Sequence, residues 1–191
     1  MQLPWDEHFF EIVLPAWQAY LASEFDLTAA VNAGDEAAAV RARYRALREG
    51  GAASFYLHHF AEIVLRAGPQ WLPGEVKDLR SLREWLGRHC TALRTDQLLD
   101  DVRLLSDVAD ALKHAVLTRN PQDRLVEAND AVLLTETGFG GGGYGEGKFG
   151  GAEQVIILSK AGRRALSGVL QNVVDAWRRG AGIDLPPIGE P

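Results

Sequence analysis

Apolar side chains recur at the three- and four-residue spacing of an α-helix through the first two-thirds of the chain. Pro15 should kink or split the first helix, because proline lacks the N–H that an interior turn needs. Gly50 and Gly51 should break or bend the chain between two helices, and Gly68 before Pro69 should end the second of these. The spacing predicts helices over residues 10–21, 35–48, 52–67, 75–93 and 96–117.

The period then changes. Residues 131–135 and 154–158 are short, rich in Val, Ile and Leu, and flanked by turn residues, which predicts two strands of a β-hairpin. A final amphipathic helix follows over residues 163–179. The predicted fold class is therefore mainly α: a helical bundle of about five or six helices with one β-hairpin (residues 131–158) inserted before the C-terminal helix.

The composition sets the class of protein. A chain of 191 residues with 47% apolar and 24% charged residues is typical of one soluble domain, which we place at residues 1–182, followed by a proline-rich tail at 183–191. The single cysteine excludes a disulfide framework and a cysteine-rich zinc module. A net charge of −6 argues against a strongly basic nucleic-acid-binding protein. Neither a signal peptide nor a long apolar run is present, so we expect a cytoplasmic protein that does not enter a membrane.

Nine of the fourteen residues from Gly138 to Gly151 are glycine, and an aromatic–glycine pair recurs every five residues, at Phe139, Tyr144 and Phe149. Glycine-rich loops cradle phosphates in P-loop proteins, but Lys148 is followed here by phenylalanine where those loops carry Ser or Thr. Two interpretations stay open: a hairpin loop that its aromatic side chains pin to the bundle, or a contact loop in which the same side chains anchor a partner.

The predicted helix over 96–117 carries a polar column. Arg103, Asp107, Asp110 and His114 are spaced four, three and four residues apart, so they share one side of the helix. One cation, two carboxylates and an imidazole could orient a general base or hold a divalent ion. The same pattern is also typical of a solvated helix face.

A second polar ladder lies on the helix over 52–67. Ser54, His58 and Glu62 follow one another at steps of four, opposite the apolar arc, which is usual for a solvated face. We place His58, His59 and Glu62 among the candidate binding residues, and the solvated-face interpretation weakens if this ladder faces the polar column. We predict no cofactor and no metal site, since the Glu-x-x-His pairs of di-iron bundles are absent.

Part of the chain carries a family resemblance. The run from Asp107 to His114 (Asp-Val-Ala-Asp-Ala-Leu-Lys-His), preceded by Tyr-Leu-His-His-Phe at 56–60, resembles a pattern in uncharacterised bacterial helical-bundle proteins that are distantly similar to the HEPN group. The resemblance covers about residues 52–177 and implies a bacterial protein that is RNA-directed or associated with defence. Arg83 and His89 also fit the HEPN signature Arg-x(4–6)-His, but about one such match is expected by chance in a chain of this composition.

The leading functional prediction is a helical-bundle protein that acts by binding a protein or a small ligand, through the glycine–aromatic hairpin and the polar column. The alternative is a HEPN-like ribonuclease. His114 would then act as general base on a 2′-hydroxyl, Arg103 would stabilise phosphate charge, and the two aspartates would stand beside them with His58 or His59 opposite. The net charge does not favour RNA as a partner, and a homo-oligomer stays open.

Overall fold

In a computed structural model, residues 4–92, 97–113, 124–126, 132–135, 154–160 and 162–182 are described. Their elements follow the order α1 (Trp5–His8), a π-helical turn (Phe9–Val13), α2 (Leu14–Asn32), α3 (Glu36–Ala67), α4 (Leu79–Gly87), α5 (Asp101–Lys113), β1 (Val132–Thr135), β2 (Gln154–Ser159), β3 (Gly162–Ala165) and α6 (Leu166–Ala181). The glycine-rich segment 138–151, His114 and the tail 183–191 lie outside the described residues.

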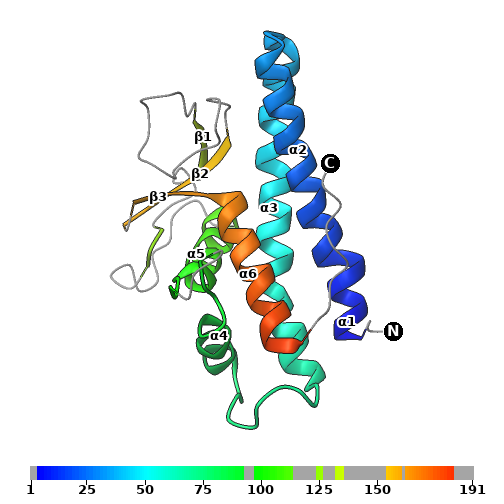
Figure 1. The fold of residues 1–191 in the computed structure, drawn as a ribbon, viewed down its shortest axis with the longest axis vertical. Coiled ribbons are helices and arrows are strands. Elements are labelled where there is room, and N and C mark those ends of the chain that lie inside the picture. Colours follow the sequence, from blue (N-terminus) through cyan, green and yellow to red (C-terminus); the bar gives the residue numbers. More distant parts are fainter. Residues whose placement is uncertain are drawn as a thin grey trace.

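Two long helices dominate the molecule. In Figure 1, α2 and α3 run side by side in opposite directions, and α6 lies beside α3, with α4 and α5 on the same side as the sheet. The π-helical turn joins α1 to α2 just before Pro15, which occupies the first turn of α2, where its missing N–H costs little. Within this turn Phe9 is buried in the core, whereas Phe10 is 37% exposed.

Helix α3 is one helix of 32 residues, so the predicted break at Gly50 and Gly51 is wrong. Gly50 instead permits close packing, because a Cβ atom there would lie 2.9 Å from Leu166 Cδ2 and 3.1 Å from Tyr20 Cε2. The predicted end is confirmed, since Gly68 closes α3 in the left-handed conformation with a φ of 57°.

Helices α4 and α5 are described over shorter ranges than the sequence predicts. Asp78 and Ser81 form a reciprocal capping box that starts α4 at Leu79 rather than at residue 75. After α4 the chain turns, and Thr91 pairs with Leu98 in an isolated β-bridge, so Leu98 precedes α5 instead of lying on it. Residues 97–100 therefore lie before α5, which apolar periodicity alone does not reveal.

The predicted hairpin is confirmed. Strands β1 and β2 pair antiparallel with Leu133 opposite Ile156, and the hairpin precedes the C-terminal helix. A third strand, β3, was not predicted. It pairs with the other edge of β2 and leads directly into α6. Its sequence, Gly-Arg-Arg-Ala, has no alternating apolar pattern, and its pairing depends on the buried central strand β2 beside it.

An aromatic chain runs through the core at the end of the bundle where α1 begins. Trp5 packs edge-on against Trp71, which stacks on Trp85, and Trp85 contacts Trp177 at a centroid distance of 6.5 Å. Phe60 then joins Trp177 at 4.9 Å. These rings connect α1, α3, α4 and α6 through large apolar contacts. Among the described helices, none has the length and apolar character needed to span a membrane.

Candidate ligand-binding groove

The carboxylates of the predicted polar column are occupied by another part of the chain. Asp107 is only 4% exposed, and its oxygens accept hydrogen bonds from Arg124 Nη1 at 2.8 Å and from the Leu125 N–H at 2.6 Å. Asp110 accepts from the same Arg124 nitrogen at 2.7 Å. Arg103 remains exposed. A single solvated column is therefore the wrong description: residues 124–126 pack over its middle and use both carboxylates as anchors.

The residues of the second ladder differ in burial. Ser54 is fully buried and donates its hydroxyl hydrogen to the Gly50 carbonyl, and His58 lines a small cavity with Leu86 and Trp177. The prediction of a solvated face is therefore wrong for these two residues, because α4, α5 and α6 cover that side of α3. His59 and Glu62 do lie nearer the surface, with Nδ1 and Oε1 3.2 Å apart.

His58 is linked to α4 by a contact that the sequence gives no means to predict. Arg83 Nη2 lies 3.3 Å from His58 Nε2, although the two residues are 25 positions apart. Burial lowers the pKa of His58 to about 4, helped by the charges of Arg83 and His59 and opposed by those of Asp110 and Glu62. At neutral pH the imidazole is therefore uncharged, so Nε2 accepts from the guanidinium and Nδ1 carries the proton.

Helices α3 and α5 pack against each other, so the charge of Asp110 on α5 acts on His58 on α3 without a hydrogen bond between them. Arg83 and His89 do not meet. The His89 ring packs against Trp85 at 4.9 Å, and its carbonyl accepts from Arg179 Nη1. Of the predicted site residues that are described, Asp107 and Asp110 are thus brought together by Arg124, while Arg103 lies elsewhere, in a groove.

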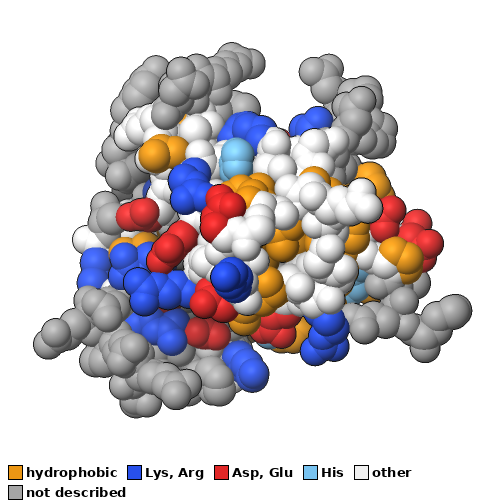
Figure 2. Space-filling view, turned by 90° about the horizontal axis from the view of Figure 1, so that it is seen from below, with side chains coloured by type: hydrophobic (Ala, Val, Ile, Leu, Met, Phe, Trp, Pro, Cys, Tyr) orange, Lys and Arg blue, Asp and Glu red, His pale blue; other side chains and the backbone are white. Residues whose placement is uncertain are grey.

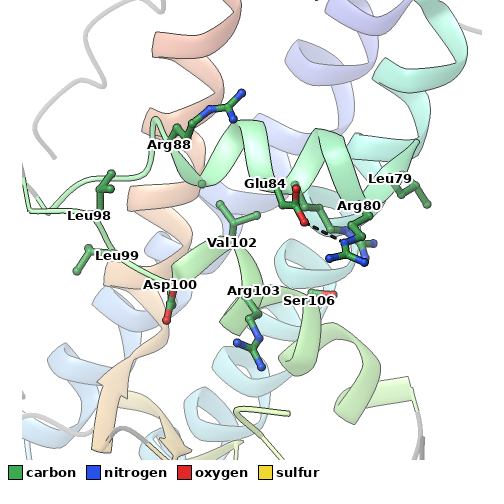
Figure 3. A pocket seen from close by; sticks show the side chains of 12 residues that line it. Leu79, Arg80, Glu84, Arg88, Leu98, Leu99, Asp100, Val102, Arg103 and Ser106 are labelled. Carbon is green, nitrogen blue, oxygen red and sulfur yellow. Dashed lines mark hydrogen bonds and ion pairs between the residues drawn. The ribbon is translucent and has the colours of Figure 1, made fainter. Parts of the chain in front are cut away.

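This groove has a volume of about 660 Å³ and lies between α4 and α5. Figure 3 shows Val102 between the two ends of the groove, with Leu98 and Leu99 on one side and Arg80 and Leu79 on the other. These leucine and valine side chains give the groove a largely apolar lining. Gly87 and Ser106 also line it, and their small side chains leave the space open.

Charged side chains surround this apolar lining. Four arginines line the groove against two carboxylates, which leaves two positive charges in excess in a chain whose net charge is −6. The carboxylates are Glu84, which pairs with Arg80 at 2.9 Å, and Asp100. Figure 2, a view from below, shows Lys and Arg side chains gathered on one side of that face, with Asp and Glu among them. The four arginines are Arg80, Arg83, Arg88 and Arg103.

Comparison with models of protein families, with curated proteins and with solved structures finds no significant match. Within the described residues, no three His, Cys, Asp or Glu side chains come together as a metal site requires. Cys90, the one cysteine, is buried, and its burial together with the charge of Asp101 raises its pKa to about 11, so its thiol is not activated. The groove has the size and the mixed apolar and charged lining of a ligand-binding site.

Proposed function

We propose that this protein binds a small organic molecule in the groove between α4 and α5. The observation that carries the proposal is the groove itself, whose volume of about 660 Å³ lies within the range of roughly 300–1,000 Å³ found for small-molecule sites. Its combination of leucine and valine side chains with a few charged groups is also typical of such sites.

The walls of the groove support a preformed site. On α4 the capping box fixes the first turn, and the side chains of Leu82 and Leu86 are buried in the core. On α5 the buried residues Val102 and Leu105 hold the opposite wall against the core. Ligand binding would therefore cost little conformational entropy in these helices, which favours affinity.

Binding through the glycine–aromatic hairpin stays a prediction, because that segment lies outside the described residues. The ribonuclease alternative also stays a prediction, since His114 lies outside them too. The groove differs from both predicted surfaces and shares only Arg103 with them.

The proposal can be tested by filling the groove. The probe is 8-anilinonaphthalene-1-sulfonate, a fluorescent dye with an apolar body and one sulfonate. A Cβ atom on Gly87 would meet open space, so Gly87→Phe should fold and place a ring in the groove. We expect the wild-type protein to bind the dye and Gly87→Phe to bind it at least about tenfold more weakly, a loss of about 1.4 kcal/mol.

The matched control is Gly168→Phe. Gly168 is also a helical glycine with open space around its Cβ position, but it lies on α6 outside the groove. This variant should bind the dye like the wild-type protein. Absence of binding by the wild-type protein, or equal binding by the two variants, would contradict the proposed function.

A further inference from the structure

The four arginines of the groove differ in what balances their charge. Arg80 is paired with Glu84, Arg88 is exposed to water, which solvates a guanidinium well, and Arg103 also lies at the surface. Arg83 is half-buried between the groove and the small cavity that contains His58. A charge withdrawn from water requires a partner of opposite charge or a dense set of hydrogen bonds.

Arg83 has no such partner in the part of the chain that the structure describes. No carboxylate there lies within ion-pair distance of its guanidinium, and its contact is with the imidazole of His58. That imidazole is uncharged at neutral pH, so it accepts one N–H and leaves the positive charge uncompensated. The other N–H groups of the guanidinium stay available for a second acceptor.

The contact with His58 also restricts the guanidinium. A planar guanidinium held at one nitrogen presents its remaining donors in a fixed fork, which fits the two oxygens of a carboxylate, sulfonate or phosphate. The adjoining lining of the groove, Val102 with Leu98 and Leu99, is apolar. An anionic group and an apolar body are therefore both accommodated in one continuous space.

We propose that the ligand of the groove is an organic anion whose carboxylate, sulfonate or phosphate pairs with Arg83 and whose apolar body lies on Val102, Leu98 and Leu99. This inference rests on the proposed function and names its ligand class. His58 is a positioning residue in this site: it touches Arg83 and not the ligand.

The test compares two probes that differ by one charge: the anionic dye 8-anilinonaphthalene-1-sulfonate and its uncharged counterpart N-phenyl-1-naphthylamine. We expect the wild-type protein to bind the anionic dye at least about tenfold more tightly. Raising the salt concentration from about 50 to about 500 mM should weaken binding of the anionic dye and leave the neutral one unchanged, because salt screens the ion pair. This measurement needs no variant.

Substitutions then identify the arginine that pairs with the anionic group of the dye. Arg83→Gln should weaken the anionic dye by about tenfold or more and leave the neutral dye within about twofold, since a charge-assisted hydrogen bond contributes about 1.5–3 kcal/mol. Arg41→Gln is the matched control, because it removes the same charge from an exposed arginine on α3 that does not line the groove, and it should change neither affinity by more than about twofold.

The role of His58 is tested by a pair of variants. Glutamine keeps an acceptor for the guanidinium, whereas leucine fills similar space without one. His58→Gln should therefore keep the affinity for the anionic dye within about threefold, and His58→Leu should weaken it by about tenfold without affecting the neutral dye. A purely structural role would affect both dyes alike.

The outcomes separate this inference from the proposed function. If both dyes bind in the groove with equal affinity, or if Arg83→Gln leaves the anionic dye unaffected, the anion assignment is wrong and the groove remains a small-molecule site. If neither dye binds, or if Gly87→Phe removes neither, the groove is not a binding site and both proposals are wrong.

Discussion

Buried acidic residues in this protein hold separate segments together. Asp101 has no exposed surface and accepts hydrogen bonds from Arg164 Nη2 at 2.8 Å and Asn172 Nδ2 at 2.7 Å, which joins the start of α5 to β3 and α6. Glu24 accepts from the Tyr20 hydroxyl at 2.6 Å and from the Val155 N–H at 3.1 Å, which joins α2 to β2. A buried carboxylate removed from such partners leaves donors unsatisfied, so these residues are structural anchors.

Asp107 belongs to the same class, which leads to a prediction. Asp107→Asn should lower the free energy of unfolding by about 2–3 kcal/mol, because the amide would turn one donor toward Arg124 or the Leu125 N–H. Asp110→Asn is the matched control. It shares Arg124 but is half-exposed, so it should cost about 1 kcal/mol or less. Urea unfolding followed by circular dichroism measures both. Equal effects of the two substitutions would show that Asp107 is not the anchor that its contacts indicate.

At the scale of the elements, the sequence predicts most helices and the hairpin because their apolar residues recur at a regular period. What it misses depends on contacts between distant residues. The sequence at Gly50 predicts a helix break. In the structure Gly50 lies inside one long helix, at a point where Tyr20 and Leu166 pack closely against its backbone. Strand β3 has no apolar pattern of its own and depends on β2. The groove was missed for the same reason, since its walls come from two helices and its Arg83 is held by His58 on a third.

Two glycines of α6 provide a test of close helix packing. A Cβ atom on Gly180 would overlap Trp85 Cη2, and the Trp85 ring is confined by its stacking on Trp71. Gly180→Ala should therefore destabilise the protein by about 1–3 kcal/mol. A Cβ atom on Gly168 meets nothing within 4 Å, so Gly168→Ala should stabilise it by up to about 1 kcal/mol through helix propensity. Thermal unfolding compares them, and a shift of the same sign for both would refute this account of Gly180.

For the whole molecule, the α2–α3 hairpin acts as the support to which the other elements attach in two ways. Aromatic rings join α1, α4 and α6 to it around Phe60 and Trp177. Buried carboxylates attach the sheet to the helices: Glu24 joins α2 to β2, and Asp101 joins α5 and α6 to β3. His58 lies where these parts meet, on α3 beneath α4 and facing α5. Its protonation state is therefore a property of the assembled fold, not of its own helix.

This placement predicts how stability depends on pH. The charged groups that face His58 are Arg83 from α4, Asp110 from α5, and His59 and Glu62 from α3, and with burial they lower its pKa from 6.5 to about 4. The unfolded chain therefore binds a proton that the folded protein does not, between those two values. Stability should fall as the pH drops from 6.5 toward 4, by about 2 kcal/mol from this residue alone at pH 4.5. Below pH 4 both states are protonated, and the loss is complete.

Urea unfolding at pH 7 and pH 4.5 measures this loss, and variants isolate its source. His58→Gln has no proton to gain, so its free energy of unfolding should fall by about 2 kcal/mol less than that of the wild-type protein over this range. His59→Gln keeps His58 and removes only a lesser contribution to its lowered pKa, so it should lose nearly as much stability as the wild-type protein. Because the three proteins have the same carboxylates, the difference between the wild-type and His58→Gln curves belongs to position 58. Parallel curves for wild type and His58→Gln would mean that His58 is not held uncharged by the contacts between α3, α4 and α5.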